Sequence, residues 1–321
     1  SKHDFFPRME IISDSLKSFK LLLLLKELFK LLCYFCYIPI SRIKMRNIFS
    51  SDDIIIVSSP AAGMFMSSKN RFILEIHTKF EYFWGTNKLG RLQSKLMSKP
   101  YITVFRTKSD MEKASKYFNS TYSYNFINKE LFNDTVSIGE KIRKHKIIYM
   151  GRFGKEKNLP KMIECAKQLK KQIPDFTLDM YGTGVLVDDI ARLIEDNALS
   201  ENVHLCGFCN DKNIFDNYSL LWLTSDFEGM SMTIIEAKAK GVPTISTNWG
   251  DGVFEVIHDE EDGFVENTVE DIVDRTVELM NDKELLINIS KNALKNFDEF
   301  SKENAYKRWI ELLKRFEGEL E

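Results

Sequence analysis

Long uncharged stretches are missing from this chain, and cysteine, proline and glycine are all scarce. The 321 residues include 5 Cys, 7 Pro and 15 Gly, and every window of 18 residues carries a charge. Because a membrane-spanning helix needs about 20 predominantly apolar residues, the sequence predicts none. The 44% hydrophobic and 29% charged content excludes collagen-like and disordered chains, and it indicates a globular protein long enough for two domains.

The cysteines form two Cys-x-x-Cys pairs with one left over. Cys33 and Cys36 lie in an apolar run, which is typical of small buried thiols. Cys206 and Cys209 have the spacing of zinc and redox sites, but no His pair lies near them in the sequence. We therefore expect neither zinc binding nor redox activity at these cysteines. The odd number of cysteines, with no segment of signal-peptide type, predicts a cytoplasmic protein.

Charge is divided unequally between the two halves. Residues 1–144 carry 24 Lys and Arg against 13 Asp and Glu, whereas the remainder carries 21 against 34. A basic first half indicates an anionic partner for it. The basic residues form no nucleic-acid-binding motif, so an anionic membrane surface or a phosphate-bearing acceptor is the better hypothesis.

Residues 15–40 are rich in leucine and are interrupted by lysines at positions 17, 20, 26 and 30. Two interpretations remain open. The segment is either the core helix of an α/β domain, apolar on nearly all sides, or a basic amphipathic helix on a bilayer. In the second case, residues 15–46 would place the protein peripherally on the inner face of the membrane.

Both halves of the chain alternate strand-like and helix-like segments. In the first half, residues 52–59, 71–77 and 101–105 are short apolar runs typical of buried parallel strands, and residues 109–118 follow with a helical pattern. A polar stretch at residues 133–144 is the predicted linker. In the second half, strands are expected at residues 145–150, 177–181, 203–205, 220–223 and 244–246. Helices are expected at residues 159–172, 186–197, 232–240, 269–280 and 302–316.

This alternation predicts two doubly wound parallel sheets that face each other across a cleft. Residues 1–143 would form the N-terminal domain and residues 144–300 the C-terminal domain. The terminal helix, in residues 301–321, would pack back on the N-terminal domain. Small-molecule sites usually lie in such clefts.

Two loops carry residues suited to a nucleotide-sugar. After the strand at 145–150, Gly151 and Gly154 allow close backbone approach, and Arg152 and Lys157 supply cations for phosphate oxygens. The second loop starts a helix, for which Ser231 is a plausible N-cap. Its free backbone N–H groups, from Gly229 to Met232, form an anion site. Glu228 and Glu236 flank this helix start and suit sugar hydroxyls.

Five ordered motifs give the chain a family resemblance. They are Gly-Arg-x-x-x-Glu-Lys-Asn (151–158), Tyr-Gly-Thr-Gly (181–184), Val-His-Leu-Cys-Gly-Phe (203–208), Glu-Gly-Met-Ser-Met-x-x-x-Glu-Ala (228–237) and Gly-Val-Pro (241–243). Together they resemble the retaining nucleotide-sugar glycosyltransferases of family 4. The resemblance implies the GT-B fold of two Rossmann-like domains and is strongest over residues 145–265.

The resemblance also implies a role for each matching residue. Arg152 and Lys157 match the pair that grips the donor diphosphate, Glu228 the glutamate beside the donor sugar, and Glu236 the glutamate that binds the ribose hydroxyls. His77 occupies the place of a histidine that touches the sugar. The backbone of Gly229, Met230, Ser231 and Met232 would meet the sugar and phosphate. The base and ribose pocket would be lined by Gly182, Gly184, Gly207 and Phe208.

The expected reaction is metal-independent hexosyl transfer with retention, because fixed cations and the helix start meet the charge on the leaving phosphate. The sequence has no Asp-x-Asp loop to hold a metal ion, and no cofactor is expected. A UDP-linked hexose is the expected donor. A cell-surface glycan or a lipid-linked acceptor is the expected acceptor, which would place the protein in polysaccharide biosynthesis.

The chain departs from the family pattern at its start. Residues 1–12 have the pattern of a later strand, and no glycine precedes Gly63, so the opening βα units of the first domain are expected to be absent. This keeps an alternative open, in which the chain is a catalytically weak glycosyltransferase-like partner that needs another chain to complete the site. The intact set of Glu228, Glu236, Arg152 and Lys157 favours an enzyme.

Overall fold

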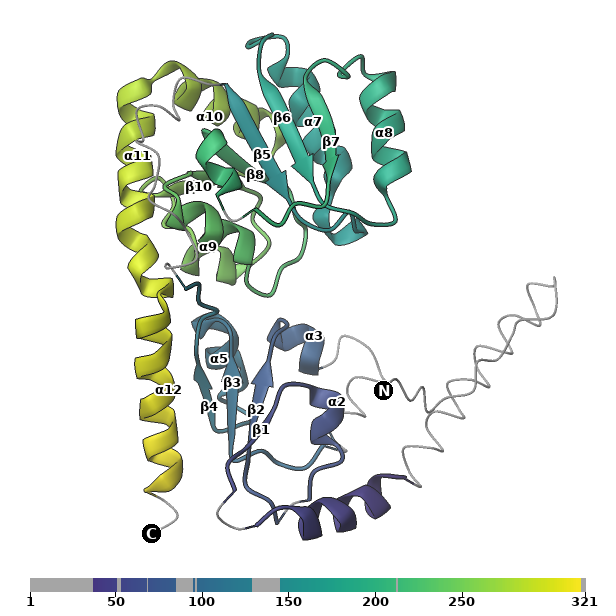
Figure 1. The fold of residues 1–321 in the computed structure, drawn as a ribbon, viewed down its shortest axis with the longest axis vertical. Helices are drawn as coiled ribbons and strands as arrows, with labels where there is room; N and C mark the ends of the chain where they lie inside the picture. The colour runs from purple at the N-terminus through teal and green to yellow at the C-terminus, as the bar shows by residue number, and fades with distance from the viewer. Residues whose placement is uncertain are drawn as a thin grey trace, which may run out of the picture.

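A computed structural model shows two α/β domains stacked along the long axis of the molecule (Figure 1). It describes residues 37–50, 53–67, 69–84, 95, 97–128, 145–211 and 213–318. The predicted linker at 133–144 and most of the leucine-rich segment at 15–40 lie outside these ranges.

The first domain is built on a parallel sheet whose four described strands follow one another in sequence order. These are β1 (Ile55–Val57), β2 (Phe72–Ile76), β3 (Ile102–Phe105) and β4 (Ser120–Tyr122). Its helices are α2 (Pro60–Gly63), α3 (Phe80–Trp84) and α5 (Lys108–Ala114), and residues 37–48 are also helical. The sequence pattern missed β4 because Ser-Thr-Tyr is a short, half-buried strand without an apolar run.

The second domain has a six-stranded parallel sheet in the order β10-β9-β8-β5-β6-β7 within the described residues. The strands are β5 (Lys146–Met150), β6 (Thr177–Tyr181), β7 (Val203–Gly207), β8 (Leu220–Leu223), β9 (Thr244–Ser246) and β10 (Gly263–Val265). Strand order reverses between β5 and β8, and doubly wound sheets bind ligands beyond the strand ends at this switch point. The loops after β5 and β8 are the two that sequence analysis singled out.

Helices cover both faces of this sheet and bury its apolar strands. They are α7 (Leu159–Leu169), α8 (Val187–Asp196), α9 (Met232–Ala239), α10 (Val269–Asn281) and α11 (Lys283–Asn296). Short 3-10 turns connect them at η2 (Lys155–Lys157), η3 (Ile214–Asn217), η4 (Asp251–Glu255) and η5 (Phe297–Phe300). Sequence analysis missed β10, which has only three residues, and α11, which begins directly after α10 at the cap residue Asp282.

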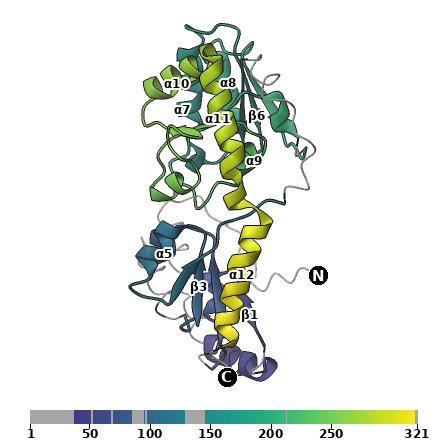
Figure 2. The ribbon, with the colours of Figure 1, turned by 90° about the vertical axis from the view of Figure 1, so that its left-hand side faces the viewer.

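The last helix, α12 (Lys302–Glu317), returns to the first domain. Both views show it continuing the line of α11 down the side of the lower sheet (Figures 1 and 2). Its Leu312 and Phe316 pack on Ile73 and Val104 of that sheet. The Arg71 guanidinium lies 4.0 Å from the centre of the Tyr101 ring and also donates to the Phe316 carbonyl at 3.1 Å. The chain therefore ties the second domain back to the first through α12.

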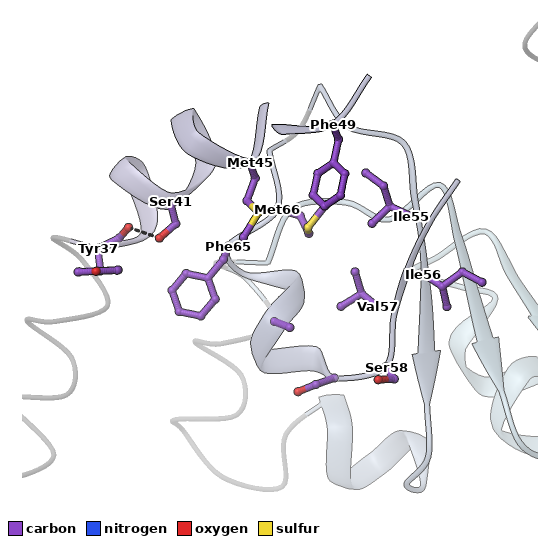
Figure 3. Close-up of a pocket in the computed structure, with 12 residues that line it drawn as sticks. Tyr37, Ser41, Met45, Phe49, Ile55, Ile56, Val57, Ser58, Phe65 and Met66 are labelled. Atoms are coloured by element: carbon purple, nitrogen blue, oxygen red, sulfur yellow. Dashed lines mark hydrogen bonds between the residues drawn. The ribbon is translucent and has the colours of Figure 1, made fainter. Parts of the chain in front are cut away.

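An apolar pocket of about 500 Å³ lies between the helix at residues 37–48, strand β1 and α2. Figure 3 shows Met45 and Phe49 pointing from the helix side toward Ile55 and Val57. The same helix buries Ile38 but leaves Ile40 and Ile43 51% and 65% exposed, so apolar side chains occupy both of its faces.

Candidate functional site

The loop after β5 packs tightly against the loop after β6. Gly151 N–H donates to the Tyr181 carbonyl, and Phe153 N–H donates to the Thr183 carbonyl, each at 2.9 Å. A Cβ on Gly182, whose φ is +144°, would lie 1.8 Å from the Gly151 carbonyl oxygen. Only glycine fits there, which explains the Gly-Thr-Gly motif by backbone contact.

Glycine is needed at positions 151 and 154 for a different reason. Their φ values are outside the left-handed region, but a Cβ on Gly154 would lie 2.4 Å from the Glu156 carboxylate, and one on Gly151 would lie 2.8 Å from the Tyr149 hydroxyl. These two glycines therefore make room for neighbouring side chains rather than providing unusual backbone angles.

The loops after β5 and β8 are joined by hydrogen bonds into one unit. Asn158, which adopts the left-handed conformation with φ 46°, donates from its side-chain amide to the Asp226 carboxylate at 2.8 Å. Asp226 N–H donates to the Glu156 carbonyl at 2.9 Å. The Thr224 hydroxyl donates to the Lys157 carbonyl at 3.1 Å. The residues suited to phosphate and sugar are thus held together before any ligand arrives.

Arg152 and Lys157, two of the three cations on the first loop, are each paired with a glutamate. Lys157 donates to a Glu228 oxygen that also accepts from the Ser225 hydroxyl, and both partners of the Lys157–Glu228 pair are largely buried. Arg152 donates to Glu156 at 2.6 Å, and its side chain is 73% exposed. Lys157 is therefore fixed inside the site, whereas Arg152 lies at its rim. Together they place two positive charges beside the strand switch point.

The helix α9 begins where the second loop ends. Ser231 occupies its N-cap position, as the sequence predicts, but its side chain makes no capping hydrogen bond. Since the first N–H groups of a helix have no partner within the helix, the turn from Gly229 to Met232 offers donors and the positive end of the helix dipole. Such a helix start binds anions such as phosphate.

A cavity of about 520 Å³ lies beside this helix start. It is lined by residues from the loops after β5, β6 and β7 and by two residues of α9. The lining residues are Met150, Gly151, Arg152, Tyr181, Gly182, Thr183, Gly184, Phe208, Cys209, Thr233 and Glu236. The structure thus brings Glu236 and Arg152 into one cavity, with Phe208 as a ring at its edge that is 77% exposed.

Sequence analysis missed several members of this cavity. Thr233 lies one helical turn before Glu236 and donates to the Met150 carbonyl at 3.1 Å. The Tyr181 hydroxyl lies 3.0 Å from that of Tyr218, which donates to Asp179 at 2.7 Å. Tyr181 and Thr183 lie within a motif that was recognised only for its glycines. The Tyr218 contact is long-range, and no local signal points to it.

His77 lies on the opposite wall of the cleft, just after β2. A Cβ on Gly229 would lie 2.8 Å from the His77 carbonyl oxygen, so the two walls meet at this glycine. Arg106 Nε lies 3.3 Å from His77 Nδ1, and the same guanidinium donates to Glu75 at 2.5 Å. Burial, followed by the charge of Arg106, lowers the pKa of His77 below its ordinary value of 6.5. The imidazole is therefore neutral at pH 7.

Further contacts tie the two walls together, and none has a local signature in the sequence. Lys79 donates to the carbonyl of Trp249 across the cleft. Glu255 accepts from the backbone N–H groups of Lys108 and Ser109, at 2.6 and 2.7 Å, and thereby caps α5 from the other domain. These contacts hold the first-domain wall against the segment between β9 and β10.

No three His, Cys, Asp or Glu side chains gather closely enough to hold a metal ion, among the residues whose placement is described. The arrangement can accept a diphosphate between Arg152, Lys157 and the start of α9. A nucleoside would extend into the 520 Å³ cavity toward Glu236. A sugar on the other side of the diphosphate would lie near Glu228 and His77.

Two Rossmann-like domains that face each other, with a phosphate-suited switch point in the second one, are the architecture of the GT-B glycosyltransferases. The solved structures that resemble this chain show the same fold. TarM of S. aureus, crystallised with fondaparinux, alpha-GlcNAc-glycerol and UDP, has a TM-score of 0.72 and 22% identity, covering 85% of this chain and 58% of that one. HepE of Anabaena, in complex with UDP, has a TM-score of 0.72 and 16% identity, covering 82% of this chain and 79% of that one.

The family is shown by residues 133–296, which match the model of the glycosyl transferases group 1. The chain belongs to this family. It is 28% identical over 171 residues to the poly(glycerol-phosphate) alpha-glucosyltransferase of Bacillus subtilis, covering 52% of this chain and 25% of that one. It is 28% identical over 168 residues to the poly(ribitol-phosphate) alpha-N-acetylglucosaminyltransferase of Staphylococcus aureus, covering 51% of this chain and 34% of that one. The chain thus matches about a quarter to a third of the length of these two relatives.

The chain therefore belongs to the glycosyl transferases group 1 and has the GT-B fold, as sequence analysis predicted. The family match favours the enzyme over the non-catalytic partner that was the alternative. Within the described residues, no helix is both long enough and apolar enough to cross a membrane.

Proposed function

We propose that this chain transfers a hexose from a UDP-sugar to a hydroxyl group of a cell-surface glycan or lipid-linked acceptor, with retention and without a metal ion. One observation carries the proposal: Lys157 and Glu228 are paired at the strand switch point, directly before the start of α9 and next to a cavity that contains Glu236. A nucleotide-sugar has a diphosphate between two polyhydroxylated groups, and this unit offers cations between two carboxylates.

In this proposal the donor lies along the rim of the second sheet. Glu236 accepts hydrogen bonds from the ribose hydroxyls, and the turn at Gly182–Gly184 with Gly207 and Phe208 holds the base. Arg152, Lys157 and the N–H groups of residues 229–232 bind the diphosphate. Glu228 and His77 contact the transferred sugar from the two walls.

The mechanism follows from where charge develops. As the bond between the anomeric carbon and the phosphate oxygen breaks, the electron pair leaves with UDP and the sugar gains oxocarbenium character. Fixed donors at that phosphate stabilise the transition state most strongly when water is excluded. The acceptor oxygen then bonds to the anomeric carbon on the same face, and its proton passes to the departing phosphate. Glu228 positions the sugar in this scheme rather than acting as a nucleophile.

Two kinds of observation support the finer parts of the proposal. The names of both relatives specify α-linked products, and retention is the outcome that gives an α product from an α-linked donor. Lys157 is fixed and largely buried in its pair with Glu228, and since an ammonium group has three N–H donors it would also donate to an oxygen of the leaving phosphate without a divalent cation. UDP is the nucleotide in the two structures with the same fold.

A peripheral position on an anionic membrane fits the first domain. On the helix at residues 37–48, Ile40 and Ile43 face outward, with the exposed Lys44 and Arg46 on either side of them. Apolar side chains flanked by cations are typical of helices that lie in a membrane interface. This position would bring the cleft close to a lipid-linked acceptor.

The membrane proposal is tested by co-sedimentation with vesicles that contain phosphatidylglycerol. Replacing Ile40 and Ile43 with Ser should reduce the bound fraction several-fold, and so should replacing the four lysines at positions 17, 20, 26 and 30 with Gln. The control is Tyr306→Ser on α12, which removes an exposed aromatic side chain far along the chain. Unchanged co-sedimentation of both variants would refute the membrane role.

The transfer reaction is tested with UDP-glucose and UDP-N-acetylglucosamine in the presence of EDTA. The expected result is UDP release that increases on addition of a glycan or polyol acceptor, and NMR of the product should show an α-anomeric proton. A β-linked product would contradict retention. Activity that requires an added divalent cation would contradict metal independence.

A further inference from the structure

A second pocket lies on the far side of the helix start that borders the nucleotide cavity. It has a volume of about 350 Å³ and is lined by Glu75, Arg106, Asn125, Phe126, Met232 and Trp309. These residues come from β2, from the segments after β3 and β4, and from α9 and α12. The volume falls within the range of about 300–1,000 Å³ that is usual for small-molecule sites.

The polar part of this pocket is a fixed, charge-balanced pair. Arg106 and Glu75 side chains are 10% and 16% exposed, and they are joined at 2.5 Å. Arg106 also donates to the Ser123 carbonyl at 3.2 Å and contacts His77. Because the two charges cancel, the pair favours a neutral ligand whose hydroxyl groups accept from and donate to it, rather than a phosphate.

The apolar part of the pocket is aromatic. Phe126 is 47% exposed, and Trp309 is partly buried where it packs on the cluster of Ile73, Ile102 and Val104. Flat rings of this kind cover the C–H face of a sugar ring or polyol chain, while polar groups at the edge bind its hydroxyls. Carboxylate, guanidinium, amide and aromatic groups in one pocket therefore suit a polyhydroxylated molecule.

The pocket lies beside the residues proposed to contact the transferred sugar. Met232, the first residue of α9, lines it, whereas Thr233 and Glu236 of the same helix line the nucleotide cavity. Asn125 N–H donates to the sulfur of Met230 at 3.3 Å, so the pocket wall contacts the turn at residues 229–232. Arg106 contacts His77, which lies on the wall facing that turn. A ligand here would lie next to the expected sugar, on the side away from the nucleotide.

We infer that this pocket binds the acceptor, through a neutral polyhydroxylated unit that stacks on Phe126 and Trp309 and hydrogen-bonds to Glu75, Arg106 and Asn125. The inference rests on the proposed transfer function and assigns the acceptor side of it. It also gives α12 a direct part in the site, since this helix follows the second domain in sequence and supplies Trp309 to a pocket of the first.

The test is saturation-transfer NMR on the full chain in the presence of UDP, with methyl α-D-glucopyranoside, ribitol and glycerol as three separate probes. At least one probe should receive saturation from the protein. If UDP binds but none of the three probes does, the inference is overturned while the proposed function stands. If UDP itself does not bind, the proposed function fails first.

Substitutions then locate the binding site. Phe126→Ala and Glu75→Gln should each weaken probe binding at least tenfold and leave the affinity for UDP unchanged. Phe254→Ala is the matched control, because Phe254 is 46% exposed and lies outside the pocket. In transfer assays the two pocket variants should raise the acceptor KM and leave the KM of the UDP-sugar unchanged. Equal probe binding by Phe126→Ala and Phe254→Ala would show that the probes bind elsewhere.

Discussion

The two walls of the cleft are built in different ways. On the second-domain wall, the loops after β5 and β8 are joined by Asn158–Asp226, Lys157–Glu228 and several backbone hydrogen bonds. On the first-domain wall, the His77 side chain is 48% exposed and is contacted by Arg106. Under the proposed function, the donor diphosphate would therefore meet a preassembled surface, whereas the sugar would meet the half-exposed side chain of His77.

The most damaging change to the preassembled wall is Lys157→Ala. It removes a fixed cation from the leaving phosphate and leaves Glu228 without its partner. Loss of one preorganised donor typically lowers turnover about 10²–10³-fold, and we expect a decrease of that size in kcat/KM for the UDP-sugar. Lys155→Ala, on an exposed residue of the same turn, is the control and should change kcat/KM less than threefold. Equal effects of the two variants would contradict the role of Lys157.

Substitutions at Glu236 and Glu228 should affect UDP binding and turnover separately. Under the proposed function Glu236→Ala removes the acceptor for the ribose hydroxyls, and at about 1–3 kcal/mol for such a loss UDP binding should weaken by about five- to 150-fold. Glu228→Gln should leave UDP affinity within twofold and lower kcat instead, because the proposed function places Glu228 beside the transferred sugar. Calorimetry and initial-rate assays distinguish the two. Full activity in both variants would refute the site assignment.

On the first-domain wall, His77→Ala should lower kcat about fivefold without changing UDP affinity, because one hydrogen bond to the sugar is worth about 1 kcal/mol. Since the pKa of His77 is lowered by burial and by Arg106, the imidazole is neutral above its ordinary value of 6.5. The wild-type rate should therefore show no loss attributable to His77 protonation between pH 7 and 8. A change in UDP affinity equal to the change in kcat would place His77 on the nucleotide side.

The smallest effect is expected at the salt bridge that joins the walls. Lys113 contacts Glu81 at 2.8 Å and Asp251 at 2.9 Å. Because such exposed pairs contribute about 0–1 kcal/mol, Lys113→Ala should lower the free energy of unfolding by no more than about 1 kcal/mol, measured by denaturant titration. Lys116→Ala, on an exposed neighbour, is the control.

The pH dependence of this contribution follows from the three pKa shifts. Lys113 hydrogen bonds lower the pKa of Asp251, and also that of Glu81 against the opposing effect of burial. The stabilisation by these carboxylates is therefore complete above their ordinary values of 3.8 and 4.5, and it is lost as pH falls through the lowered ones. Burial alone would lower the pKa of Lys113, but the two carboxylates raise it above 10.5. The stabilisation by Lys113 is therefore lost only when the pH rises into the strongly alkaline range. Equal stability of wild type and Lys113→Ala at pH 7 would show that the bridge contributes nothing.

The second domain was the more predictable part of the molecule. Its strands are continuous apolar runs, such as Leu-Leu-Trp-Leu in β8, and its loops carry recognisable motifs. These features are local, so the sequence pattern predicts them. The two parallel sheets and the GT-B fold were correctly predicted for the same reason, and the described strands of the second sheet show the doubly wound order.

What sequence reasoning missed depends on contacts between distant segments. Strand β4 is short and half-buried, and its pairing with β3 defines it more than its composition does. Arg106 and Trp309 lie about 200 positions apart, and only the return of α12 brings them to one pocket. The Glu255 cap of α5 likewise joins residues almost 150 positions apart. No window of sequence contains both partners of such a contact.

The central claim is that the second-domain wall is a metal-independent binding site for UDP. Calorimetric titration of the chain with UDP, GDP and ADP in the presence of EDTA tests it most directly. The account predicts that UDP binds in the range of about 1 μM to 1 mM that is usual for enzyme substrates, and that Glu236→Ala binds it more weakly. Absence of UDP binding, or binding that appears only after a divalent cation is added, would contradict the claim.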